Sequence, residues 1–214
     1  MGLPSLYLIT DRKATGPRGL IPTLEAAFKG EASLVQLREK DLSAREMLSL
    51  AKDVRKLAHK YGARLLINDR TDIALLAGAD GVHLTSKSYP AKEARRLLGG
   101  KGLIGVSTHS IEEALKAQED GADFVTFGPV FHTASKAGMG NPLGIEKLKE
   151  TVQRLSIPVF GLGGIDETNV EETAASGASV ALISAIMTSN DPERATIDLL
   201  AAAGKFGANH KERT

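Results

Sequence analysis

Eight short apolar runs rich in β-branched residues recur at a regular interval and dominate the pattern of this chain. The segments between them show helical periodicity, most clearly Ala44–Tyr61, Ile111–Asp120 and Asn169–Ser176. Alternating strands and helices joined by right-handed crossovers require a parallel sheet. The predicted strands are Leu6–Ile9, Ser33–Leu37, Arg64–Ile67, Gly81–Leu84, Leu103–Val106, Phe124–Phe127, Val159–Leu162 and Val180–Ile183.

Eight such units favour a single (β/α)8 TIM barrel, with parallel strands inside and helices outside, over an open doubly wound sheet. An open sheet more often carries its glycine-rich turn after the first strand. Here the first strand runs into Thr10-Asp11-Arg12-Lys13, and the glycine-rich turn Gly161–Gly164 follows the seventh strand. We assign the barrel to residues 1–204 and expect a polar, frayed tail over residues 205–214.

Local signals mark the helix ends. Ser43 with Glu46 three residues later forms a capping box at the start of the longest predicted helix. The phrases Ala77-Gly78-Ala79-Asp80 and Asp120-Gly121-Ala122-Asp123, with the related Ser176-Gly177-Ala178-Ser179, each predict a helix end, a glycine cap and a turn into a strand.

Composition narrows the classes of function. The net charge of +1 argues against a nucleic-acid or membrane partner, which would require a basic excess. The chain has no cysteine, which excludes disulfides, thiolate metal sites and cysteine nucleophiles. The N-terminus shows no signal-peptide pattern and the chain no long apolar span, so we expect a cytoplasmic protein. A homo-oligomer is compatible with a barrel of this size, but no stripe identifies a partner surface.

Polar residues follow the predicted strands, and barrel chemistry sits at the carboxyl ends of the strands. Alternation directs Gln36 and Arg38 inward, with Lys40 just beyond the rim. We favour an anion site here over an internal layer of salt bridges or hydrogen bonds. Asn68 and Asp69 follow the third strand; they offer oxygen atoms of the kind that magnesium prefers, or form an N-cap or turn pair for the next helix.

The later strands add further candidates. His83 is more often a structural residue than a catalyst at such a position, and Ser107 caps the next helix or contacts a ligand. The long loop 128–144 contains Lys136 and is typical of a lid or binding loop. Gly164 and Ser184, after the seventh and eighth strands, form a predicted phosphate cup. The positive charge exceeds the need of one phosphate and suggests a diphosphate as well, whose departure cations and magnesium assist.

These residues together resemble the thiamine-phosphate synthase and thiazole tautomerase superfamily. The resemblance spans nearly the whole chain in order. Its motifs are Leu8-Ile9-Thr10-Asp11, Gln36-Leu37-Arg38-Glu39-Lys40, Asn68-Asp69, Gly81-Val82-His83-Leu84, Gly128-Pro129-Val130-Phe131, Thr133 with Ser135-Lys136, Gly161 with Gly163-Gly164-Ile165, and Ile183-Ser184.

The resemblance implies an enzyme that joins a hydroxymethylpyrimidine diphosphate to a thiazole phosphate and releases diphosphate, with Mg²⁺ held by Asp69. Residues implied to hold the pyrimidine diphosphate are Gln36, Leu37, Arg38, Glu39, Lys40, Asn68, Ser107 and Lys136. Those implied to hold the thiazole phosphate are Thr133, Ala134, Ser135, Gly164, Ile183 and Ser184. The catalytic roles fall to Arg38, Lys40, Lys136 and His132.

Two departures from the synthase pattern keep alternatives open. Ser88 stands where synthases usually carry a second magnesium-binding aspartate, and a neutral hydroxyl supplies no charge. His132 is new in its loop, in which the tautomerase uses a histidine, although at the position held here by Pro129. The first hypothesis is a synthase. The second is a tautomerase-like isomerase acting on a carboxythiazole phosphate, and the third a non-catalytic protein that binds thiamine phosphate or thiazole phosphate.

Overall fold

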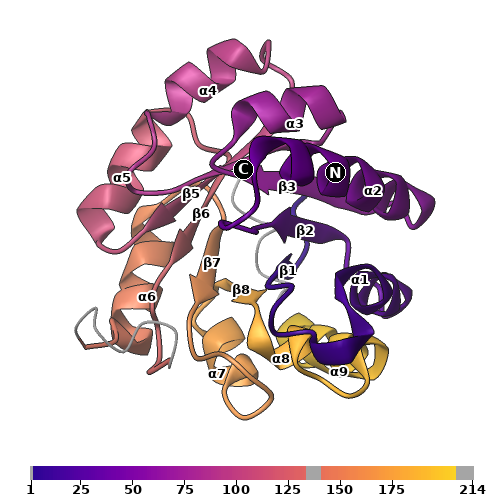
Figure 1. Ribbon diagram of the computed structural model, residues 1–214. Coiled ribbons are helices and arrows are strands. Elements are labelled where there is room, and N and C mark those ends of the chain that lie inside the picture. The colour runs from indigo at the N-terminus through magenta and orange to yellow at the C-terminus, as the bar shows by residue number, and fades with distance from the viewer. Residues whose placement is uncertain (1, 134–140, 206–214) are drawn as a thin grey trace.

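The computed structural model describes residues 2–133 and 141–205 and contains a closed barrel of eight parallel strands in sequence order (Figure 1). Strand β1 pairs with β8, Leu6 opposite Val180, which closes the barrel. The single-barrel prediction is confirmed, and each predicted strand is present with ends shifted by at most two residues. The strands are β1 Leu6–Ile9, β2 Leu34–Leu37, β3 Arg64–Asn68, β4 Gly81–Leu84, β5 Leu103–Thr108, β6 Phe124–Phe127, β7 Val159–Leu162 and β8 Ser179–Leu182.

The helices surround the strands as an outer ring (Figure 1). All three helices named from the sequence are confirmed to within one residue at each end. The capping box is confirmed too: the Glu46 amide donates to Ser43 Oγ at 3.4 Å, and the Ser43 amide donates to the Glu46 carboxylate at 2.9 Å. The helices are α1 Leu20–Lys29, α2 Ala44–Lys60, α3 Thr71–Ala77, α4 Ala91–Leu97, α5 Ile111–Glu119, α6 Gly144–Arg154, α7 Val170–Ala175, α8 Ser184–Met187 and α9 Pro192–Gly204, with a short 3-10 helix η1 at Gly16–Arg18.

The core has two parts because each strand is buried on both faces. Outward-facing strand residues such as Val35 and Leu37 pack against the helices. Inward-facing residues fill the barrel, where the rings of Tyr7, Phe124 and Phe160 meet edge to face with centroids 5.2–5.6 Å apart. The barrel is therefore a packed interior, and a ligand has access only at its ends.

The recurring Gly-Ala-Asp turns tie the amino ends of neighbouring strands together. Gly78 and Gly121 adopt positive φ values of 64° and 88°, as the predicted caps require. The carboxylate of Asp80 then accepts the amide proton of Leu65 at 2.8 Å, and that of Asp123 accepts the amide proton of Ile104 at 2.7 Å. Asp80 also forms an ion pair with Arg55 of α2, and Asp123 forms one with Arg95 of α4.

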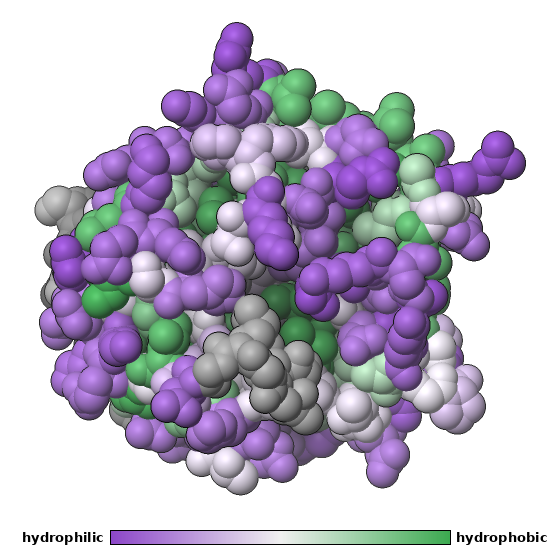
Figure 2. Space-filling model, turned by 60° about the vertical axis from the view of Figure 1, so that its left-hand side comes forward, coloured by the Kyte–Doolittle hydropathy of each residue, from purple (hydrophilic) through white to green (hydrophobic). Residues whose placement is uncertain are grey.

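Hydrophilic residues cover most of the face in Figure 2, and hydrophobic residues show between them in small groups. Leu75, Leu76 and Leu97 are among the large hydrophobic residues that remain exposed. Single exposed apolar side chains are normal for a folded protein and need no partner to explain them. Within residues 2–133 and 141–205, none of the helices has the length and hydrophobicity needed to span a membrane.

Candidate active site

Positive charge gathers where β2, β3 and β4 end. Arg38 follows β2, and its amide donates to the hydroxyl of Thr10 at 2.9 Å, which fixes the turn against β1. The guanidinium of Arg38 lowers the pKa of Lys40; partial burial and the charge of Lys87 lower this pKa further, while Asp69 raises it. The two cations named from the sequence therefore share one electrostatic environment with a third, Lys87, which sequence reasoning had not included.

The side chains of Leu37 and Glu39 point away from this environment. Leu37 is fully buried among the strands and helices. The buried Glu39 carboxylate accepts from the hydroxyl of Thr10 at 2.6 Å and from the amide of Arg12 at 3.1 and 3.2 Å. Because alternate residues of a strand face opposite ways, 36 and 38 face inward and 37 and 39 outward. Only main-chain atoms of Leu37 and Glu39 remain for the ligand contacts expected from the sequence.

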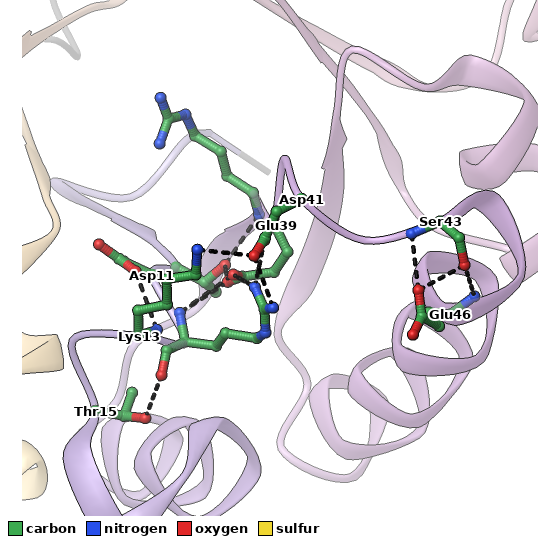
Figure 3. A network of polar contacts seen from close by, with 10 residues as sticks. Asp11, Lys13, Thr15, Glu39, Asp41, Ser43 and Glu46 are labelled. Carbon is green, nitrogen blue, oxygen red and sulfur yellow. Dashed lines mark hydrogen bonds and ion pairs between the residues drawn. The ribbon is translucent and has the colours of Figure 1, made fainter.

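Glu39 belongs to an ion-pair network that fixes the start of the barrel mouth (Figure 3). The Arg12 guanidinium bridges Glu39 at 3.3 Å and Asp41 at 2.5 Å, and Lys13 pairs with Asp41 at 2.8 Å. The hydrogen bond from Arg12 holds the pKa of Asp41 well below its usual range. The network connects the segment after β1 to the segment after β2. The backbone that carries Arg38 is therefore fixed by Thr10 at Arg38 itself and by Arg12 at the residues that follow.

Asp69 follows β3 at the barrel mouth. Its side chain is exposed, and its φ of 59° is unusual for a residue other than glycine. Its amide donates to the carbonyl oxygen of His83 at 2.8 Å. The Asp69 carboxylate accepts a short hydrogen bond from the hydroxyl of Ser88. Neither Asn68 nor Asp69 caps α3, whose N-cap is Arg70 without a side-chain cap bond, so the N-cap part of the alternative is wrong.

The donor set at Asp69 is small. No group of three or more His, Cys, Asp or Glu side chains suited to a metal occurs within residues 2–133 and 141–205. Magnesium typically uses one or two protein carboxylates together with water and substrate phosphates. One carboxylate with the neutral oxygen of Ser88 beside it fits a magnesium ion whose remaining ligands come from a diphosphate.

A buried polar layer lies inside the barrel beneath the mouth. The layer consists of side chains from five different strands, namely Tyr7, Gln36, His83, Ser107 and Thr126. Burial, with a contribution from the charge of Arg38, lowers the pKa of His83 to about 3. His83 is thus a neutral, hydrogen-bonded structural residue, as the sequence predicted. Sequence reasoning missed Tyr7, although a tyrosine within an aliphatic strand was a visible signal.

The glycine turn after β7 is packed against the loop after β6. Gly163 and Gly164 have φ values of 102° and 67°. A Cβ on Gly164 would lie 2.4 Å from the carbonyl oxygen of His132, and one on Gly163 would lie 2.8 Å from the Pro129 ring. The amide of Phe131 donates to the Gly163 carbonyl at 3.0 Å. Glycine is therefore required here by both conformation and packing.

The other predicted residues of the phosphate side are only partly placed. Strand β8 ends at Leu182, one residue before its predicted end, and Ser184 is exposed at the start of α8. The chain bends there because Ile183, with φ −122° and ψ −84°, forms the N-cap of α8. Thr133 is half-buried and the His132 side chain is exposed. Ala134, Ser135 and Lys136 lie outside the described residues.

The fold and the mouth define a class: a (β/α)8 barrel in which the cations, the Asp69 carboxylate and the glycine turn all follow the carboxyl ends of the strands. The family model described as thiamine monophosphate synthase matches residues 6–186. The chain belongs to this family, whose enzymes are transferases of thiamine biosynthesis.

Individual proteins agree with the family match. A protein of Geobacter sulfurreducens is 56% identical over 198 residues, which cover 92% of this chain and 93% of that protein. The thiamine-phosphate synthase of Clostridium novyi is 42% identical over 192 residues, covering 89% and 94%. The solved structure of a thiamine phosphate pyrophosphorylase from Pyrococcus furiosus superposes with a TM-score of 0.85 at 35% identity, covering 94% and 96%.

Proposed function

We propose that the barrel mouth joins hydroxymethylpyrimidine diphosphate to thiazole phosphate and releases diphosphate. The observation that carries this proposal is the shared environment of Arg38, Lys40 and Lys87 beside Asp69. A diphosphate gains negative charge as it leaves, and preorganised cations stabilise that charge more than they stabilise the bound substrate. The names of the relatives also favour a synthase over the isomerase and over the non-catalytic binding protein.

The chain's residues divide into two groups in this proposal. The pyrimidine diphosphate would lie on the side of β2 to β5, in contact with the side chains of Arg38, Lys40, Asn68 and Ser107 and with the main chain of Leu37 and Glu39. Gln36 would meet it from the buried polar layer beneath, and Lys136 from the loop after β6. The thiazole phosphate lies on the side of β6 to β8, against Thr133, Ala134, Ser135, Gly164, Ile183 and Ser184. The two substrates would then face one another across the mouth.

The reaction breaks one bond and makes one. The carbon–oxygen bond between the pyrimidine methylene and its diphosphate breaks, and the electron pair leaves with the diphosphate. The resulting cation accepts the lone pair of the thiazole nitrogen, so no external acid or oxidant is needed. Arg38 and Lys40 bind the departing oxygens, and the buried layer closes the barrel beneath the cation against water.

Magnesium would be held by the carboxylate of Asp69, next to the hydroxyl of Ser88. The ion would supply further positive charge at the leaving diphosphate. Asp69 lies in the electrostatic environment of Lys40, so the protein groups that bind the diphosphate and the group that binds the ion are neighbours.

A turnover assay tests the proposal. The purified chain, both substrates and MgCl₂ should yield thiamine phosphate and diphosphate in equal amounts by mass spectrometry. Arg38→Ala should lower kcat by about a hundredfold, the usual effect of removing one transition-state donor. Lys52→Ala, on the exposed face of α2, is the matched control and should leave turnover unchanged.

Absence of product at high enzyme concentration would contradict the proposal. Ser88→Asp adds the carboxylate that synthases usually carry at this position. We expect turnover within severalfold of the native chain. A gain of several orders of magnitude would show that the native chain is not competent as a synthase.

A further inference from the structure

A continuous chain of hydrogen bonds runs through the barrel from β2 to β5. The Gln36 side-chain nitrogen donates to the Tyr7 hydroxyl at 2.9 Å, and this hydroxyl lies 3.2 Å from Nδ1 of His83. Nε2 of His83 lies 2.9 Å from the hydroxyl of Ser107. Tyr7, Gln36 and His83 are each at most 1% exposed, whereas Ser107 is half-buried near the end of β5. The chain thus begins in the core and ends towards the mouth.

Counting protons gives this chain a direction. A phenolic hydroxyl carries one proton, and among the described residues Nδ1 of His83 is the acceptor within reach of the Tyr7 hydroxyl, whose other partner, Gln36, is a donor; the Tyr7 proton therefore goes to Nδ1. A neutral imidazole that accepts at Nδ1 carries its proton at Nε2, so His83 donates to Ser107. Thr126 Oγ1 also lies 3.5 Å from Nε2, but a protonated Nε2 cannot accept, so Thr126 donates to the Ser107 hydroxyl at 3.4 Å. With its lone pairs occupied, Ser107 has its own proton left to donate.

The histidine ring is fixed in this state. Burial lowers the pKa of His83 to about 3, which keeps the ring neutral at pH 7. A Cβ on Gly105 would lie 2.5 Å from Nδ1 of His83 and 2.4 Å from the Phe124 ring, so only glycine leaves room for the imidazole. The ring centroid lies 5.6 Å from that of Tyr7 and 5.8 Å from that of Phe124. Close packing on these sides opposes a ring flip that would exchange the two nitrogens.

We propose that Tyr7 and His83 are positioning residues that fix Ser107 as a hydrogen-bond donor towards an anionic oxygen at the barrel mouth. The inference rests on the proposed function only in identifying that oxygen as part of a diphosphate. The opposite direction of the chain would present oxygen lone pairs of Ser107 to the mouth and would repel an anion. The direction of the buried bonds therefore determines which ligand atoms the mouth accepts.

The direction can be observed without any ligand. Long-range proton–nitrogen NMR spectra distinguish the two neutral tautomers of a histidine and its charged form. The chain has five histidines, and the signal lost in His83→Gln assigns the one required. We expect a proton on Nε2 and none on Nδ1 at pH 7. A proton on Nδ1, alone or together with one on Nε2, would overturn the inference.

The effect on the mouth is measured by calorimetric binding of inorganic diphosphate in the presence of MgCl₂. Tyr7→Phe and Ser107→Ala should each weaken binding on the order of tenfold, the size of one hydrogen bond to a charged group. The double variant should bind no worse than Ser107→Ala, because Tyr7 acts through Ser107. Tyr61→Phe removes a phenol that bonds to Glu25 at the end of α2 and should leave affinity unchanged.

Substitutions of His83 separate positioning from simple packing. In His83→Gln the amide can accept from Tyr7 and donate to Ser107, so diphosphate affinity should be largely retained. His83→Leu fills similar space without either hydrogen bond and should weaken diphosphate binding about tenfold. Additive losses in the double variant, or equal affinity of the Gln and Leu variants, would overturn the inference. Failure to turn over the two substrates would instead contradict the proposed function and leave these binding results intact.

Discussion

The buried histidine makes the stability of the barrel depend on pH in a defined direction. The pKa of His83 falls from an ordinary 6.5 in the unfolded chain to about 3 in the fold, chiefly through burial. Between these two values the unfolded chain binds a proton at this ring and the folded chain does not. Acidification from pH 6.5 towards pH 3 therefore favours the unfolded state, and above pH 6.5 this contribution to the pH dependence vanishes.

The magnitude follows from the same two pKa values. A pH of 4.5 is two units below the His83 pKa of 6.5 in the unfolded chain, and it is still above the His83 pKa of about 3 in the fold. Each unit corresponds to 1.36 kcal/mol, so His83 should lower the free energy of unfolding by about 2.7 kcal/mol relative to neutral pH. This is a large share of the roughly 5–15 kcal/mol by which a domain is stable.

Urea unfolding at pH 7.5 and pH 4.5 measures this contribution. The native chain should lose about 2–3 kcal/mol more between the two pH values than His83→Gln, which keeps both hydrogen bonds and does not titrate. Carboxylates that titrate in the same range affect both proteins alike and cancel in the comparison. His59→Gln, at an exposed position in the last turn of α2, should behave as the native chain. Equal losses in the native chain and His83→Gln would refute the assignment of a neutral ring.

Two further predictions concern the mouth. Gly164→Ala should lower the free energy of unfolding by about 2 kcal/mol or more, because its Cβ meets the His132 carbonyl at a positive φ. Gly62→Ala, with φ of 68° and open space, isolates the conformational cost, and equal losses in both variants by urea unfolding would contradict the packing argument. Asp69→Asn should raise the magnesium concentration needed for half-maximal turnover by about tenfold or more, and an unchanged magnesium titration would remove Asp69 from the ion site.

The fold was predictable because its signals are local. Apolar runs such as Phe124–Phe127, glycine caps and the Ser43 capping box each act within a few residues. Some strand ends differed from their predicted positions because hydrogen bonds to a neighbouring strand determine where a strand ends. For example, β5 continues to Thr108 because Thr108 pairs with Phe127 of β6. Local sequence carries no record of that partner.

The site was predictable in part. Strand alternation correctly directed Gln36 towards the barrel interior, and the same rule could have excluded the side chains of Leu37 and Glu39. The partners of Glu39 lie on the segment after β1, and this pairing follows from barrel closure instead of a local motif. Lys87 was missed for the same reason, since its effect on Lys40 arises between loops that follow different strands.

The aspartate turns have a consequence for how such a chain can evolve. Asp80 and Asp123 secure the amino ends of β3 and β5, whereas the candidate ligand contacts lie at or beyond the carboxyl ends of the strands. A substitution at the mouth leaves these anchors intact, so the chain can acquire a new substrate while keeping its ability to fold. Residues that maintain the fold and residues that determine the reaction therefore lie at opposite ends of the same strands and can change independently.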